Sequence, residues 1–282
     1  MKKPEMTWGQ TRWWLLRLGL PLLIGILIAS AIPRPLIGII RLDDAIYNLS
    51  ARDMLTQINY ASEHPKIRAV VLAIDSPGGT VVDTEAIYME LARLRAKKPV
   101  VIAINGMAAS GAYYLAVNSD YVYAKPTSLV GNVGVIGYLP PAPFITEDII
   151  STGPYKLWGS PRDTDIRQIE MIKQGFYQAV MLGRGDRLLT GPETILSGKI
   201  WPGIEAVRLG VVDELGTEND AIHKAVQLAR VWHYESVELR GLVGVQNSSI
   251  PFFLQSPDGI VLPYPTKPGI YMLYIPQLPL KQ

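Results

Sequence analysis

Two glycine-bearing loops, each following an apolar run, carry the residue types that acyl transfer needs. Residues 69–74 run into Asp75-Ser-Pro-Gly-Gly79, and residues 100–104 run into Asn105-Gly-Met-Ala-Ala-Ser-Gly111. The second loop places Ser110 where a strand is expected to turn into a helix, and the first offers backbone N–H groups from consecutive glycines. A nucleophile beside such N–H groups is the minimal requirement for acyl transfer. The two loops therefore indicate a serine hydrolase.

Ser110 needs a neighbouring base that removes the proton of its hydroxyl group. The chain has three histidines, His64, His223 and His233. His64 precedes a proline in a turn, where we expect it to be solvated, so a histidine-based triad is not the favoured arrangement. A lysine is the alternative. It works as a base only when neutral, which requires burial that lowers its pKa.

Further short motifs follow in a fixed order along the chain. They are Gly106-Met-Ala-Ala-Ser-Gly-Ala-Tyr-Tyr114, Gly131-Asn-Val-Gly-Val-Ile-Gly137, Tyr155-Lys156, Gly159-Ser-Pro161, Gly198-Lys-Ile-Trp-Pro-Gly203 and Leu209-Gly-Val-Val-Asp-Glu-Leu-Gly216. With the Asp75–Gly79 block, they resemble the signal peptide peptidase A family of S49 serine peptidases. These are membrane-anchored enzymes related in fold to the Clp protease and to crotonases. The resemblance covers about Pro35 to Arg230.

The resemblance assigns a role to each residue of a serine–lysine dyad. Ser110 would be the nucleophile and Lys156 the base, with the N–H groups of Gly79 and Gly111 forming the oxyanion hole. The neighbours of Lys156 are bulky and none is acidic, which fits desolvation, whereas the alternative is an ordinary surface lysine on a loop. If Ser110 did not lie nearby in the sequence, these glycines would be interpreted simply as residues that form turns. We expect no cofactor and no metal ion.

Weaker candidates for the base lie elsewhere in the chain. Lys125, Lys173 and Lys199 lie in an expected turn, helix and late loop, respectively.

The chain departs from the family at two places. Asn132 stands where the family usually has a serine that hydrogen-bonds the lysine; its amide oxygen can still accept a proton, so we expect it to orient the lysine. The segment 138–152 is shorter and richer in proline than its family equivalent, so the position of Lys156 is less well fixed than that of Ser110. Some family members draw the lysine from a neighbouring subunit, and the resemblance implies a ring-like homo-oligomer.

Composition and the N-terminus bear on location. The chain has 282 residues, is 48% hydrophobic, carries a formal net charge of +2 and contains no cysteine, which excludes thiol catalysis and gives no indication of a nucleic-acid partner. Basic residues precede an uncharged stretch at 18–33, and residues 13–33 approach the length of a membrane span. We expect a single-pass anchor with the catalytic domain extracytoplasmic. The alternative is a signal peptide cleaved after Ala29-Ser-Ala31.

Alternating apolar runs and amphipathic segments predict an α/β fold with parallel strands. The resemblance implies a crotonase/Clp-like ββα superhelix with an N-terminal transmembrane helix. Strands are expected at 36–42, 69–74, 99–104, 121–124 and 133–136, and helices at 50–62, with Ser50 as N-cap, 81–96, 110–117, 166–183, 192–197, 204–209 and 220–232. The sequence therefore predicts three parts of the chain. They are a cytoplasmic N-terminus with the anchor (residues 1–34), a peptidase domain (35–240) and a proline-rich tail (241–282).

The tail is apolar and poor in charge. We expect it to be extended and to pack along the ring or in a substrate groove; the alternative is a disordered tail. The function predicted is a membrane-anchored serine endopeptidase that cleaves hydrophobic peptides such as remnant signal peptides. Two alternatives stay open. One is a related protease that cuts stomatin-like proteins, and the other, motivated by Asn132, is a catalytically silent scaffold.

Overall fold

The structure is a computed structural model that describes residues 13, 15–31, 34–138, 152, 162–245, 253–255, 261–263 and 269–275. The chain divides into two compact units, Met1–Pro35 and Leu36–Gln282. Each is described by itself. The segment that contains Lys156 lies outside the described residues.

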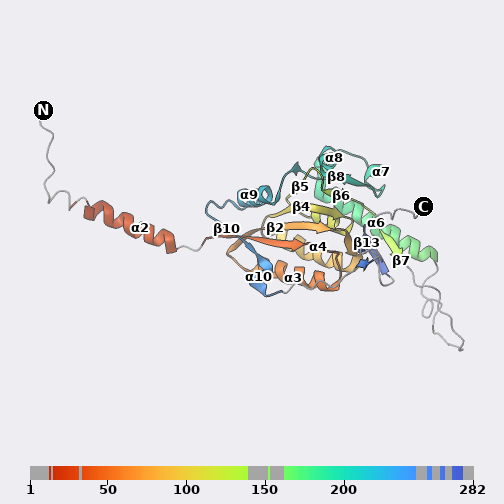
Figure 1. The fold of residues 1–282 in the computed structure, drawn as a ribbon, viewed down its shortest axis with the longest axis horizontal. Helices are drawn as coiled ribbons and strands as arrows, with labels where there is room; N and C mark the ends of the chain where they lie inside the picture. The colour runs from red at the N-terminus through yellow and green to blue at the C-terminus, as the bar shows by residue number, and fades with distance from the viewer. Residues whose placement is uncertain are drawn as a thin grey trace. The chain divides into compact units, whose positions relative to one another are not determined.

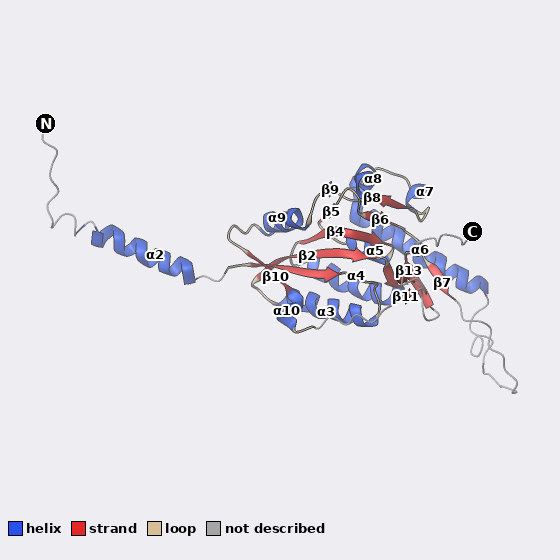
Figure 2. Cartoon of the chain, viewed as in Figure 1, coloured by secondary structure: helices blue, strands red, loops and turns tan. Residues whose placement is uncertain are grey.

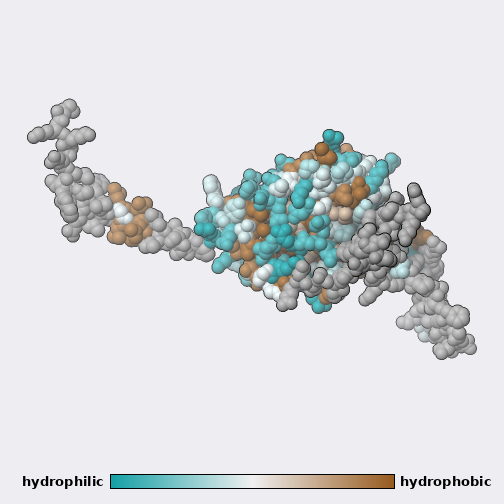
Figure 3. All heavy atoms as spheres, viewed as in Figure 1, coloured by the Kyte–Doolittle hydropathy of each residue, from teal (hydrophilic) through white to brown (hydrophobic). Residues whose placement is uncertain are grey.

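The first unit contains a five-residue π-helix η1 (Leu15–Gly19) that continues into the helix α2 (Leu20–Ala31). Those of its apolar side chains that the structure describes are exposed, with Leu18 at 63%, Leu22 at 66% and Leu23 at 58% of full exposure, and they form the brown segment of Figure 3. Within the described part of the chain, no helix combines the length and the apolar character that a membrane crossing requires.

The second unit is built on an eight-stranded sheet with the order β10-β1-β2-β4-β5-β9, in which β6 pairs with β4 and β8 pairs with β6 (Figures 1 and 2). Its strands are β1 (Leu36–Leu42), β2 (Ile67–Ser76), β4 (Val100–Ala109), β5 (Tyr121–Ala124), β6 (Leu129–Gly131), β8 (Ile200–Pro202), β9 (Glu214–Leu215) and β10 (Glu235–Glu238). All pairs are parallel except β6 with β8. The predicted α/β class is confirmed, with a mixed sheet.

Helices cover both faces of this sheet, so residues 69–74 of β2 and 100–104 of β4 are all apolar and buried. The side chains of Val70 and Leu72 on β2 enter the larger cluster, and those of Ala69 and Val71 enter the smaller one on the opposite face. The helix α9 (Glu218–Ala229) covers the smaller cluster.

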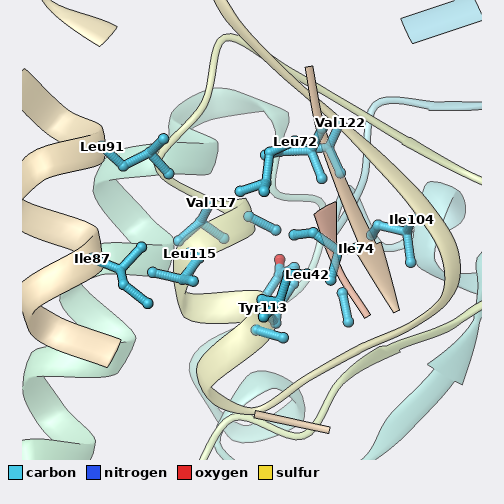
Figure 4. Close-up of a cluster of buried hydrophobic side chains, with 14 of the residues drawn as sticks. Leu42, Leu72, Ile74, Ile87, Leu91, Ile104, Tyr113, Leu115, Val117 and Val122 are labelled. Carbon is cyan, nitrogen blue, oxygen red and sulfur yellow. The ribbon is translucent and has the colours of Figure 1, made fainter. Parts of the chain in front are cut away.

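Four helices pack on the face with the larger cluster, of which Figure 4 shows the centre. They are α3 (Asn48–Glu63), α4 (Val81–Arg95), α5 (Gly111–Ala116) and α10 (Leu239–Val243). Leu91 of α4, Tyr113 of α5 and Ile74 of β2 meet there.

A long helix, α6 (Arg162–Arg184), also packs on the larger cluster through Phe176. It ends in a buried ion pair, in which Arg184 donates from both terminal nitrogens to the carboxylate of Asp213 at 2.9 Å each. Asp213 also accepts the backbone N–H of Val122 at 2.7 Å, so it joins the end of α6 to the start of β5. The short elements η2 (Gly185–Arg187), α7 (Pro192–Ile195) and α8 (Gly203–Arg208) follow.

A second, three-stranded antiparallel sheet has the order β3-β13-β7. It combines β3 (Gly78–Thr80) and β7 (Ile136–Tyr138) with β13 (Gly269–Leu273) from the far end of the chain. Figure 1 shows blue β13 beside yellow-green β7. A separate pair is formed by β11 (Phe253–Gln255) and β12 (Val261–Pro263).

Three sequence predictions need correction. The strand predicted at 133–136 is not formed as such: residues 132–135 form no strand, because Gly131 and Asn132 have φ angles of 118° and 57° that end β6, and Ile136 begins β7. Ser50 is not the N-cap of α3. Tyr47 is the N-cap, and its N–H donates to Ser50 Oγ at 3.0 Å from inside the first turn. The tail is not extended from its first residue, since α10 continues to Val243.

Candidate active site

Ser110 stands at a sharp turn between a buried strand and a buried helix. It follows β4, which ends at Ala109, and precedes α5, which begins at Gly111, and its backbone has φ 54° and ψ −119°. Its N–H donates to the Gly131 carbonyl at 2.8 Å, and its own carbonyl accepts the N–H of Tyr114 at 2.9 Å. A non-glycine residue holds such a conformation only when its surroundings impose it. The turn is similar to the strand-to-helix turn that presents the serine nucleophile in α/β-hydrolases, although residues 108–112 do not have the G-x-S-x-G pattern of those enzymes.

The glycine loop after β2 lies directly against this turn. A Cβ built on Gly78 would stand 2.7 Å from the backbone nitrogen of Gly111 and 2.9 Å from the carbonyl oxygen of Ala109. Only a glycine permits this approach, and Gly78 also has a φ of 92°. Gly111 is the first residue of α5, where backbone N–H groups have no partner within the helix.

The backbone N–H and C=O groups of Gly79 point away from Ile46, which lies in the neighbouring segment of the same chain. The carbonyl of Gly78 accepts the N–H of Ile46 at 2.8 Å, and the N–H of Thr80 donates to the carbonyl of Ile46 at 2.9 Å. Because successive residues of a strand point their N–H and C=O groups in opposite directions, those of Gly79 face the other side. The structure thus brings the loop with Gly79 and the N-terminus of α5 with Gly111 together beside Ser110.

Asn132 follows the residue that bonds Ser110, so it lies near the same turn. Its N–H donates to the Lys199 carbonyl at 2.7 Å, and its side-chain Nδ2 donates to the Gly198 carbonyl at 2.8 Å. The amide nitrogen is therefore engaged, and the amide oxygen is the group with which Asn132 can accept a hydrogen bond from a lysine. Lys156 lies outside the described residues, so the pairing of Asn132 with Lys156 stays a prediction.

All three histidines lie away from Ser110. His64 ends α3, stacks on Tyr60 with ring centroids 3.6 Å apart, and precedes β2, while His233 precedes β10. In a parallel sheet, both lie at the amino edge, whereas Ser110 follows the carboxyl end of β4. His223 belongs to α9 on the opposite face.

One of the weaker lysine candidates has an acidic partner. Lys173 of α6 forms an ion pair with Glu170 at 2.6 Å, within the same helix.

Sequence reasoning missed two side chains that hold the site. The carboxylate of Asp75 accepts the N–H of Met107 at 2.9 Å and fills the space beside Gly106, so it fixes the loop that leads to Ser110. Thr84 of α4 is fully buried, donates to the Thr80 carbonyl at 2.7 Å and lies against Gly111. Asp75 could have been found from the sequence, because it directly follows the apolar run at 69–74. The sequence around Thr84 gives no comparable indication of its role.

A serine held in a strained strand-to-helix turn beside a glycine loop defines the site as that of a serine hydrolase. The profile of peptidase family S49 matches residues 92–232, and the profile of the Clp protease family matches residues 36–130. The chain belongs to peptidase family S49. This finding confirms the family that the ordered motifs indicated and the predicted class, a serine peptidase of Clp-like α/β fold.

Similar proteins have names that fit the family. The chain is 34% identical over 224 residues to putative protease MJ0651 of Methanocaldococcus jannaschii, covering 72% of each chain. It is 35% identical over 205 residues to Protease 4 of Salmonella typhi, a match that takes 67% of this chain and 33% of that protein. It is 27% identical over 186 residues to a putative signal peptide peptidase SppA of Enterococcus faecium, covering 61% and 54%. The chain thus matches about a third of the length of the Salmonella protein.

Proposed function

We propose that this chain is a membrane-anchored serine endopeptidase that uses Ser110 and Lys156 to hydrolyse apolar peptides such as remnant signal peptides. The observation that carries the proposal is the backbone of Ser110, held at φ 54° and ψ −119° beside Gly78 and Gly111. A strained turn of this kind is retained where the position of a side chain matters for chemistry. Lys156 is supported by the sequence motifs around it.

The geometry suits a two-step acyl transfer. A neutral Lys156 takes the proton of Ser110 Oγ as this oxygen attacks the peptide carbonyl, and the N–H groups of Gly79 and Gly111 stabilise the resulting oxyanion. The lysine then gives the proton to the departing amine. A water molecule, deprotonated in the same way, releases the acyl group from Ser110. Asn132 would orient the lysine through its amide oxygen.

Anchoring is supported by the first unit. Its helical residues expose apolar side chains, and basic residues precede them, which favours an N-terminus in the cytoplasm and a catalytic domain outside it. The name of the Enterococcus relative supports signal peptides as substrates. A homo-oligomer that encloses the sites would protect other proteins from a peptidase with broad preference.

Peptide hydrolysis tests the dyad. Wild type, Ser110→Ala, Lys156→Ala and the double variant are compared on a fluorogenic apolar peptide, with Lys173→Ala as the matched control. We expect each dyad variant to lose at least about 10³-fold in kcat, with no further loss in the double variant because the two groups act as a unit. The control should keep its activity. Near-wild-type turnover in Ser110→Ala would remove the nucleophile assignment, and in Lys156→Ala it would move the base elsewhere. Absence of peptidase activity in the wild type would favour the alternative that the protein is a catalytically silent scaffold.

Topology is tested separately. Cells stripped of their wall or outer membrane are treated with protease, and we expect residues 35–282 to be digested while an N-terminal fragment stays with the membrane. Protection of residues 35–282 would reverse the orientation. A soluble form that starts at Ile32 would show a cleaved signal peptide.

A further inference from the structure

The strand β13 occupies a position that an extended peptide would take beside Ser110. It is the middle strand of the three-stranded sheet, paired antiparallel with β3 on one side and with β7 on the other. In the described sheet order, β3 and β7 are joined only through β13. These two strands therefore offer their edges to a strand inserted between them, which is a common way in which proteins bind extended peptides.

The register places Met272 opposite Gly79. The polar backbone groups of Gly79 face β13, since those of its two neighbours are bonded to Ile46. Further along, the N–H of Tyr274 donates to the Pro77 carbonyl at 2.8 Å. Hydrogen-bonded pairs alternate in an antiparallel ladder, and Tyr274 opposite Pro77 is two residues from Met272 opposite Gly79. Met272 and Gly79 therefore form a hydrogen-bonding position of the ladder.

The carbonyl of Met272 lies where the oxyanion hole is predicted. A Cβ built on Gly78 would overlap the carbonyl oxygen of Met272, and one built on Gly111 would stand 3.0 Å from it. Gly78 from the loop after β2 and Gly111 from the start of α5 thus both lie beside the same carbonyl oxygen, in the space that a side chain would fill. The peptide bond that follows this carbonyl joins Met272 to Leu273.

The side chain of Met272 is 1% exposed and lies among the larger core cluster. It borders a cavity of about 260 Å³ whose apolar lining includes Tyr114 of α5 and Ile172 and Phe176 of α6. Glu85 and Gln168 are its polar members. A long unbranched side chain such as methionine fits an irregular apolar space of this kind.

From these contacts, and resting on the proposed function, we infer that residues 269–274 are a built-in pseudosubstrate that occupies the chain's own peptide groove. The segment Gly269-Ile-Tyr-Met-Leu-Tyr274 carries no charge. The groove accordingly binds an extended uncharged peptide, and the cavity beside Met272 takes an unbranched apolar side chain on the amino side of the bond to be cut. External peptides compete with the tail for this groove.

A matched pair of full-length variants tests the inference. Met272→Asp puts a carboxylate into the apolar cavity and should release β13, whereas Ile275→Asp adds the same charge two residues beyond the end of β13, where the side chain is 39% exposed. The rate at which a fluorophosphonate probe labels Ser110 is measured for both. We expect at least a tenfold faster rate for Met272→Asp and an unchanged rate for Ile275→Asp. The synthetic peptide of residues 269–274 should slow labelling of Met272→Asp again, and the same peptide with Asp in place of Met should not.

Hydrogen exchange at the Gly79 N–H gives a second measurement that does not depend on activity. We expect protection in wild type and in Ile275→Asp, and at least tenfold faster exchange in Met272→Asp. Met272→Ala, which removes the side chain without adding charge, replaces Met272→Asp if circular dichroism shows that the latter is unfolded, with the same direction expected. Equal labelling and equal exchange in wild type and variant would overturn the tail assignment. Absence of labelling in every variant would count against the peptidase instead, and Gly79 exchange would still decide whether the tail fills the groove.

Discussion

The two edges of the main sheet are built differently. At the amino edge, polar groups are satisfied by ordinary contacts: Asp120 accepts the Val100 N–H at 2.8 Å, and Lys98 donates to the His64 carbonyl at 2.7 Å. At the carboxyl edge, the backbone of Ser110 has φ 54° and ψ −119°, outside the left-handed helical region in which Arg230, before β10 at the amino edge, caps α9 with φ 54° and ψ 43°. The comparison teaches that one edge stabilises the fold and the other uses this stability to hold a reactive geometry.

If this division is right, substitutions at the amino edge should change the free energy of unfolding and leave catalysis per folded molecule intact. Substitutions of the residues that lie against Ser110 at the carboxyl edge should do the reverse. The following predictions test the division in both directions.

The largest effect on stability is expected at Arg184. Replacing it by methionine leaves the 5%-exposed carboxylate of Asp213 without its buried partner, so the free energy of unfolding should fall by about 3–5 kcal/mol in a urea titration. Arg187→Met is the control, because Arg187 bonds the same carboxylate at 3.0 Å from a side chain that is 40% exposed. The control should lose about 1 kcal/mol or less. Equal losses would show that burial does not set the contribution of this pair.

Gly111→Ala should act mainly on catalysis. The new Cβ would stand 2.9 Å from Thr84 Oγ1 and 3.0 Å from the Met272 carbonyl oxygen, so the N–H of residue 111 must shift. We expect kcat/KM to fall by about 10²–10³, the loss typical of a disturbed oxyanion hole. In Gly241→Ala, the added Cβ has nothing within 4 Å, and kcat/KM should be unchanged. A Gly111→Ala enzyme with normal kcat/KM would place the oxyanion elsewhere.

Asp120→Asn should weaken the amino edge modestly. Its carboxylate accepts the N–H of Val100 and the Nε of Arg95 at 2.9 Å. The amide can keep the first bond but loses the charge, so we expect the free energy of unfolding to fall by about 1 kcal/mol with kcat unchanged. A fall in kcat at constant stability would break the division between the edges.

The smallest effect is expected at Glu218. The hydrogen bond from the Arg41 guanidinium lowers the pKa of Glu218. A carboxylate with a lowered pKa contributes stability above its unfolded value, about 4.3, and loses it as the pH falls through the folded value. Glu218→Gln should therefore reduce stability by less than about 1 kcal/mol at pH ~6, and by progressively less as the pH falls below about 4.3, as followed by thermal unfolding over this pH range. A constant difference over this pH range would show that ionisation of Glu218 is not involved.

The sequence predicted most of the carboxyl edge because its signals are local. The apolar runs before Gly79 and before Ser110 indicated parallel strands, and loops that follow neighbouring parallel strands meet at one edge. The burial of Tyr113 and Leu115 fixes α5, and the turn at Ser110 follows from strand and helix together.

The remainder depends on contacts between distant residues. Nothing in the order of residues shows that Met272 pairs with Gly79, since this pairing spans most of the chain and rests on backbone groups that every residue has. The kink at Asn132 was missed for a different reason. Its apolar neighbours resemble a strand, whereas the positive φ is imposed by bonds to Gly198 and Lys199, far along the chain.

The central claim, that Ser110 is the nucleophile, is tested most directly by locating a fluorophosphonate adduct by mass spectrometry. Wild type is compared with Ser110→Ala and with Ser76→Ala, which alters the fully buried serine of the other glycine loop. The account predicts one adduct, on Ser110, present in wild type and in Ser76→Ala and absent from Ser110→Ala. An adduct on another residue, or equal labelling of Ser110→Ala, would contradict it.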